Sequence, residues 1–98
     1  MQINSTNEMP MKEVLEKLLK AYKIEGNITA IKIKEFWAAL MGNIIVRHTK
    51  EIIVIDKKLL IRLDSPALRN ELSYSKEKIK DAVNNEFGYD AVTDVIIR

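Results

Sequence analysis

The sequence has 98 residues and contains no cysteine, one histidine, three glycines and two prolines. Without cysteine there is no disulfide and no thiolate for metal binding or nucleophilic attack. A single histidine also excludes a metal site rich in imidazole. The three glycines, Gly26, Gly42 and Gly88, are far apart, so no glycine-rich loop can hold a nucleotide phosphate. We therefore expect no cofactor and no metal.

Long apolar runs and targeting signals are also missing. No stretch approaches the roughly 20 apolar residues of a membrane span. Residues 1–9 lack the basic start and the apolar centre of a secretory signal. We predict a cytoplasmic protein that has no membrane contact, with a flexible leader at residues 1–9 and a single domain at residues 10–98.

Catalytic pairs are equally hard to find. The acidic residues alternate with lysines in patterns typical of solvated helix faces. The serines Ser65, Ser73 and Ser75 lack the flanking glycines of a nucleophile elbow. We expect no enzymatic activity and no small-molecule substrate.

Two amphipathic segments open the predicted domain. Apolar residues recur at helical spacing over residues 11–22, and Gly26 is placed to end this helix. Thr29 is suited to cap a second helix, which contains Trp37 in its apolar stripe and ends at Gly42. The two helices are predicted to pack as a hairpin, with the Trp37 ring in the core.

A β-hairpin follows. Residues 43–48 are either a strand or a further helical turn, because they are rich in β-branched side chains but follow a helix directly. Strands are predicted at residues 51–55 and 59–63, joined by a tight turn.

The last part of the chain predicts a helical crossover and a closing strand. Ser65 followed by Pro66 starts a helix, and the polar residues 73–75 either kink it or divide it in two. Residues 92–98 form the last strand. The order ααββαβ predicts an α+β fold, with a three-stranded mixed sheet and helices packed on one face.

If that crossover is two helices, the unit from residue 59 to residue 98 has the β-α-α-β order of KH domains. A KH domain that binds nucleic acid clamps the backbone with a GxxG loop between those helices. Here this place reads Ser73-Tyr74-Ser75-Lys76, so the usual grip on RNA is missing.

Binding is the class of function that remains, and two interpretations are open. His48 and Thr49 either form a satisfied polar pair that fixes the chain where it enters the hairpin, or His48 belongs to a basic rim that contacts phosphates without reading sequence. The candidate nucleic-acid-binding residues of this rim are Arg47, His48, Lys50, Lys57, Lys58 and Lys76.

An ordered set of motifs resembles the DciA-like family, from residue 11 to the end of the chain. The set comprises Trp37 followed by Gly42, then Arg47-His48-Thr49, the hairpin IIVIDKKLLIRL, the helix opening SPALRNELS and the terminal VTDVIIR. The resemblance implies a KH-like fold, no catalysis, some direct DNA affinity and, as partner, the ring-shaped replicative DNA helicase that the family helps to place on single-stranded DNA.

The residues that match the family pattern are Trp37, Gly42, His48, Thr49, Ser65, Leu68, Glu71 and Leu72. Most of them are expected to be structural, and we assign Trp37, Gly42, Leu68 and Leu72 to the core.

Three hypotheses follow. The first is an adaptor that binds the replicative helicase and touches single-stranded DNA. The second is a KH-like module that binds RNA or associates with the ribosome. The third is an interaction domain that self-associates through an exposed strand edge, and we expect a monomer or a weak homodimer.

Overall fold

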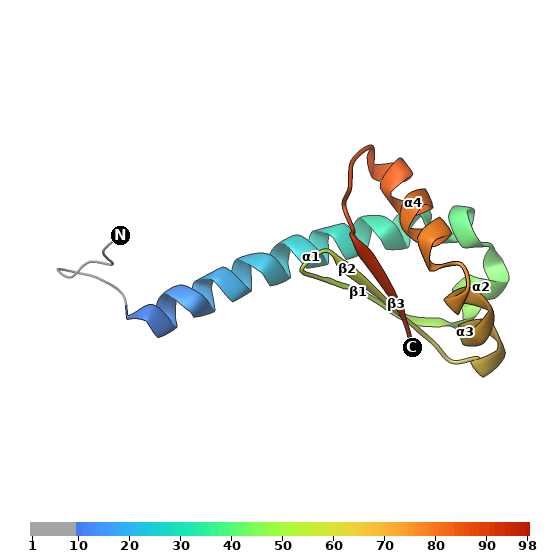
Figure 1. The fold of residues 1–98 in the computed structure, drawn as a ribbon, viewed down its shortest axis with the longest axis horizontal. Helices are drawn as coiled ribbons and strands as arrows, with labels where there is room; N and C mark the ends of the chain where they lie inside the picture. Colours follow the sequence, from blue (N-terminus) through green and yellow to red (C-terminus); the bar gives the residue numbers. More distant parts are fainter. Residues whose placement is uncertain (1–9) are drawn as a thin grey trace.

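The computed structural model describes residues 10–98, which form four helices and a three-stranded sheet (Figure 1). The predicted leader, residues 1–9, lies outside the described residues. The predicted α+β class with a three-stranded mixed sheet is confirmed. The elements are α1 (Met11–Met41), α2 (Asn43–His48), β1 (Thr49–Ile55), β2 (Lys58–Leu63), α3 (Pro66–Ser73), α4 (Lys76–Phe87) and β3 (Asp94–Ile97).

α1 is one continuous helix of 31 residues, so the predicted helix hairpin is wrong. Thr29 does not cap a second helix, because its hydroxyl donates to the carbonyl of Glu25 at 3.0 Å within α1. Gly26 does not end the first helix either, since an interior glycine costs only about 1 kcal/mol and no proline follows it here. A Cβ atom on Gly26 would lie 1.9 Å from the carbonyl oxygen of Val54. Glycine therefore allows the backbone of α1 to lie directly against that of β1.

The open question at residues 43–48 is answered by a helix, α2. Gly42 separates it from α1 with a φ of 89°, which residues with a side chain rarely adopt. Gly42 is exposed, and a Cβ on it would meet only open space. Its predicted place in the core is therefore wrong, and its contribution is the change of chain direction.

The sheet has the order β1-β2-β3, with β1 and β2 antiparallel and β2 and β3 parallel. The predicted strands at 51–55 and 59–63 are confirmed and extend by two residues and one residue toward the N-terminus. The last strand is shorter than the predicted residues 92–98. Asp56 and Lys57 form the turn with φ values of 50° and 61°, the left-handed geometry of the type I′ turn that suits strand twist.

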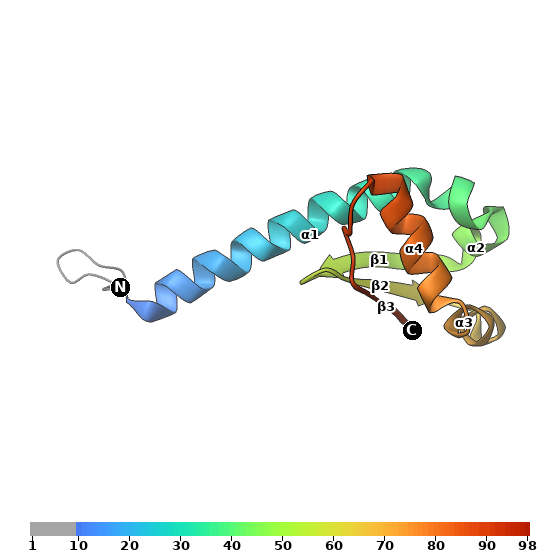
Figure 2. The same ribbon diagram turned by 45° about the horizontal axis from the view of Figure 1, so that its top comes forward.

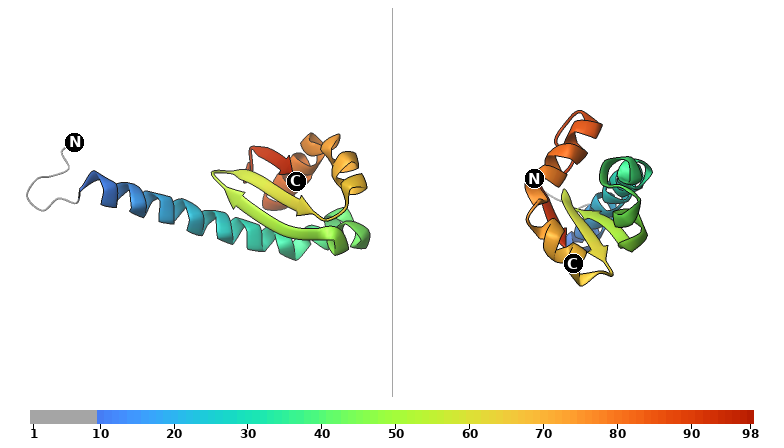
Figure 3. Two further views of the ribbon diagram at one scale, coloured as in Figure 1. Left: turned by 90° about the horizontal axis from the view of Figure 1, so that it is seen from below. Right: turned by 90° about the vertical axis from the view of Figure 1, so that its right-hand side faces the viewer.

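α1 and α4 lie on the same side of the sheet (Figures 2 and 3). On this side, Trp37 is 2% exposed and Leu72 is 8% exposed, and Leu68 packs against them as a partly buried neighbour. Trp37 and Leu72 thus lie in the core, and Leu68 lies at its border. The buried residues facing one another are Ile52, Val54, Leu59, Ile61, Leu63 and Val95 from the sheet and Ala30, Ile33, Trp37, Leu72, Ile79 and Val83 from the helices.

Residues 66–87 form two helices, which answers the second open question. The backbone N–H of Leu68 donates to Oγ of Ser65 at 3.3 Å, and Pro66 is the first residue of α3, as predicted. Tyr74 lies in the turn before α4 and is 83% exposed. The segment β2-α3-α4-β3 thus has the β-α-α-β order typical of KH domains.

The first half of α1 extends beyond the rest of the molecule (Figures 1 and 2). The buried positions of α1 begin at Gly26, and we call residues 11–25 the arm. Because the predicted hairpin does not form, Leu15, Leu18 and Leu19 of the arm are 50–59% exposed. None of the helices within residues 10–98 is long and apolar enough to span a membrane.

Candidate partner and nucleic-acid interface

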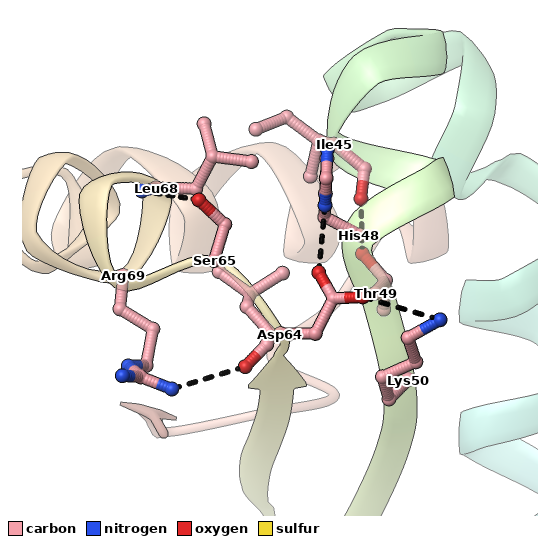
Figure 4. A network of polar contacts seen from close by, with 9 residues as sticks. Ile45, His48, Thr49, Lys50, Asp64, Ser65, Leu68 and Arg69 are labelled. Carbon is pink, nitrogen blue, oxygen red and sulfur yellow. Dashed lines mark hydrogen bonds and ion pairs between the residues drawn. The ribbon is translucent and has the colours of Figure 1, made fainter.

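A polar network joins the start of β1 to the end of β2 (Figure 4). Nδ1 of His48 donates to Oδ1 of Asp64 at 2.6 Å, and Nζ of Lys50 lies 3.2 Å from Oδ2 of the same carboxylate. The backbone N–H of Asp64 also donates to the carbonyl of His48 at 3.0 Å. Because these side chains are 41–47% exposed, the network is a surface clamp that closes the open end of the hairpin.

The clamp changes the ionisation of its carboxyl group. The hydrogen bond from His48 lowers the pKa of Asp64 below its ordinary value, and partial desolvation opposes this effect. Lys50 lowers the pKa further, through a hydrogen bond and through its charge. The carboxylate in turn neutralises part of the positive charge that Lys50 would otherwise present to a phosphate.

A second chain of hydrogen bonds ties α1 to the same junction. Nε1 of Trp37 donates to Oγ1 of Thr49 at 3.1 Å, and the Thr49 hydroxyl donates to the carbonyl of Ile45 at 2.6 Å. His48 and Thr49 therefore make the polar contacts that the structural interpretation of this pair requires. They fix the position where the chain leaves α2 and enters the hairpin.

The predicted basic residues do not form one rim. The seven residues of β1 place the junction and the hairpin turn roughly 20 Å apart. Within residues 10–98, Arg47 has no ion-pair partner. The three groups are Arg47, His48 and Lys50 at the junction, Lys57 and Lys58 at the hairpin turn, and Lys76 at the start of α4.

A groove of about 600 Å³ runs between the second half of α1 and the edge strand β1. Its apolar lining includes Ile31, which is 54% exposed, together with Ala38 and Ile53. A surface that combines apolar side chains with polar groups is typical of sites that bind another protein. This groove therefore offers a docking surface beside the junction.

The charges at this groove are mainly positive. Lys34 and Lys50 lie along it, and Glu51 is the one acidic residue among the lining residues. Glu51 accepts from Nε of Arg62 at 2.7 Å, so its charge is paired across the hairpin. A partner with acidic groups beside an apolar segment would match this surface.

The sequence analysis missed Asp64 as the partner of His48 and missed the groove. The sequence does contain a signal for the pair of His48 and Asp64, because His48 directly precedes one strand of an antiparallel hairpin and Asp64 directly follows the other. No sequence signal pointed to Ile31 and Lys34, since the groove depends on α1 running unbroken past β1. A further unpredicted contact is the bond from Nη1 of Arg69 to the carbonyl of Leu63, at 3.2 Å (Figure 4).

Together these features define a small α+β domain with a KH-type β-α-α-β unit and a groove beside its edge strand. Within residues 10–98, no group of three or more histidine, aspartate or glutamate residues could hold a metal ion. The model of the family described as "Dna[CI] antecedent, DciA" matches residues 10–97. The chain therefore belongs to the DciA family, which confirms the resemblance found in its motifs.

The DciA family is associated with loading of the replicative DNA helicase, and it is not a known enzyme family. No curated protein and no solved structure matches the chain.

Proposed function

We propose that this protein is a non-enzymatic adaptor that binds the replicative DNA helicase and assists its loading onto single-stranded DNA. The observation that carries the proposal is the family match, which spans residues 10–97 and so includes every helix and strand described above. The groove, the junction and the arm all lie within the matched residues.

The groove between α1 and β1 is the surface that we assign to the helicase. It combines exposed apolar area at Ile31 with the positive charge of Lys34. Protein interfaces of this kind use an apolar centre for affinity and charges at the rim for orientation.

Contact with single-stranded DNA is assigned to the three basic groups. Arg47 and the hairpin lysines Lys57 and Lys58 are exposed, and they can neutralise phosphates while the groove is occupied. With about three to four phosphate contacts, log K should fall by about 2 to 3 per unit of log salt. Fluorescence anisotropy of a labelled oligonucleotide over a salt series measures this slope, and an affinity that does not respond to salt would contradict the assignment.

RNA is the second candidate, and the β-α-α-β order favours it. The turn between α3 and α4 carries the exposed Tyr74 where a KH domain has its glycines. An aromatic ring can stack on a base of either nucleic acid. The same anisotropy series with RNA of matched sequence separates the two candidates, because a helicase adaptor requires binding to single-stranded DNA at least as tight as to RNA.

Size-exclusion chromatography of the protein mixed with the replicative helicase of the same bacterium tests the adaptor directly. At micromolar concentrations we expect a shifted peak that contains both chains. Two separate peaks at these concentrations would contradict the proposal.

A further inference from the structure

The arm presents an apolar stripe that nothing within residues 10–98 covers. Met11, Leu15 and Leu18 follow the four-three spacing of a coiled-coil seam, and position 22 continues it. Their side chains are 50–59% exposed, and Leu19 beside them is 59% exposed. Apolar residues grouped in this way mark an interaction surface.

This stripe continues the one that packs on the sheet. Farther along α1, Gly26, Ala30, Ile33 and Trp37 repeat at intervals of three to four residues and are buried on the side of α1 that lies against β1. An uncovered helix of about 15 residues is only marginally stable in water. The arm thus has the pattern of a packed helix and lacks a second layer.

We propose that a second copy of this chain supplies that layer, through antiparallel pairing of the two arms. The body of the molecule lies at one end of the arm (Figures 1 and 2), and by its helical spacing the stripe continues the face of α1 that packs on the sheet. Parallel arms would bring two bodies into the same space. Antiparallel arms place them at opposite ends, around a two-fold axis.

The charges along the arm suit one register of this antiparallel pair. When Leu18 lies beside position 22 of the other copy, Lys17 lies within about one turn of Glu25 of that copy along the helix axis. Both residues are on the same flank of the stripe, and antiparallel pairing brings like flanks together. The two-fold axis repeats the attraction.

A hollow at the base of the arm suits the same register. About 370 Å³ of space lies between α1 and the hairpin turn, lined by Ile28, Thr29, Val54, Tyr89 and neighbouring residues. Ile28 is 54% exposed and Tyr89 is 61% exposed. In the register above, Met11 of the other copy reaches position 29 and covers this hollow. The pairing does not depend on the function proposed above.

Sedimentation equilibrium of the full chain, from micromolar to several hundred micromolar, tests the pairing. The mass should rise from 11.3 kDa toward twice that value as the concentration increases. Leu18→Glu should weaken the dimer at least tenfold, roughly the effect expected when a seam position is lost. Lys20→Glu, on the opposite face of the arm, is the control and should change the dissociation constant by less than about twofold. Circular dichroism shows that both variants remain folded.

A charge exchange tests the direction. Lys17→Glu and Glu25→Lys should each weaken the dimer by about threefold, and the double variant should recover the affinity of the original chain. A protein that is monomeric at every concentration overturns the proposal, as does a dimer that Leu18→Glu leaves intact. A double variant no stronger than either single one overturns the antiparallel register. If the chain is monomeric and Leu18→Glu abolishes helicase binding, the stripe serves the helicase and not a second copy.

Discussion

At the scale of single residues, Gly26 and Trp37 hold α1 on the sheet. Gly26 brings the helix backbone against the carbonyl of Val54, and Trp37 fills the core farther along the same face. The Trp37 indole also donates to Thr49, the first residue of β1. These contacts set the angle between α1 and β1, and the groove lies in that angle.

Gly26→Ala should destabilise the fold by about 1–3 kcal/mol, because the added methyl group overlaps a backbone oxygen and cannot rotate away. On helix propensity alone the same change would stabilise α1 by about 1 kcal/mol. Urea denaturation, monitored by circular dichroism, distinguishes destabilisation by the overlap from stabilisation by helix propensity. Ala39→Gly, at an exposed position of α1, calibrates the propensity effect. A more stable Gly26→Ala variant would show that α1 does not lie against β1 at this point.

The clamp at Asp64 predicts a pH dependence of stability. A carboxyl group whose pKa is lower in the folded protein stabilises the fold above its unfolded pKa, and this contribution disappears as pH falls through the folded value. As the pH falls below about 4, the melting temperature of the original chain should therefore decrease more than the melting temperature of the Asp64→Asn variant. The effect is small because the pair is exposed to solvent. If the melting temperatures of the two proteins fall by the same amount between neutral and acid pH, Asp64 does not stabilise the fold through the clamp.

At the scale of elements, α3 and α4 both follow a serine, but only the first serine caps its helix. Oγ of Ser65 accepts from the N–H of Leu68, whereas Ser75 makes no such bond to α4. Ser65→Ala should cost about 1 kcal/mol of unfolding free energy, and Ser75→Ala should cost much less. Equal losses in thermal or urea unfolding would contradict this difference.

The elements also show what the sequence could and could not predict. Patterns within a few residues of the chain, such as β-strand spacing of apolar side chains and capping residues, predict the β-hairpin, the cap at Ser65 and the closing strand. The break expected at Gly26 fails, because a glycine in a helix indicates either an end or a close approach, and only the position of β1 decides between them. The same limit applies to the candidate site. His48 could be identified from the sequence, but the groove could not, because it forms between elements that are far apart in the sequence.

At the scale of the whole molecule, the chain consists of a body with a groove and an arm that extends from it. The groove lies beside the second half of α1, and the arm is its first half, so one helix links the two surfaces. The family match covers both. We assign the groove to the helicase, the basic groups to single-stranded DNA and the arm to a second copy of the chain.

The most direct test of this account is the affinity of the replicative helicase for two matched variants, measured by isothermal titration calorimetry. Ile31→Glu introduces a charge into the groove, and Ile44→Glu makes the same change at an isoleucine of α2 that does not line it. The two side chains are similarly exposed, at 54% and 61%, so neither change should unfold the protein. We predict that Ile31→Glu weakens binding by at least about tenfold and that Ile44→Glu leaves it nearly unchanged. Equal affinities for both variants and the original chain would contradict the assignment of the groove to the helicase.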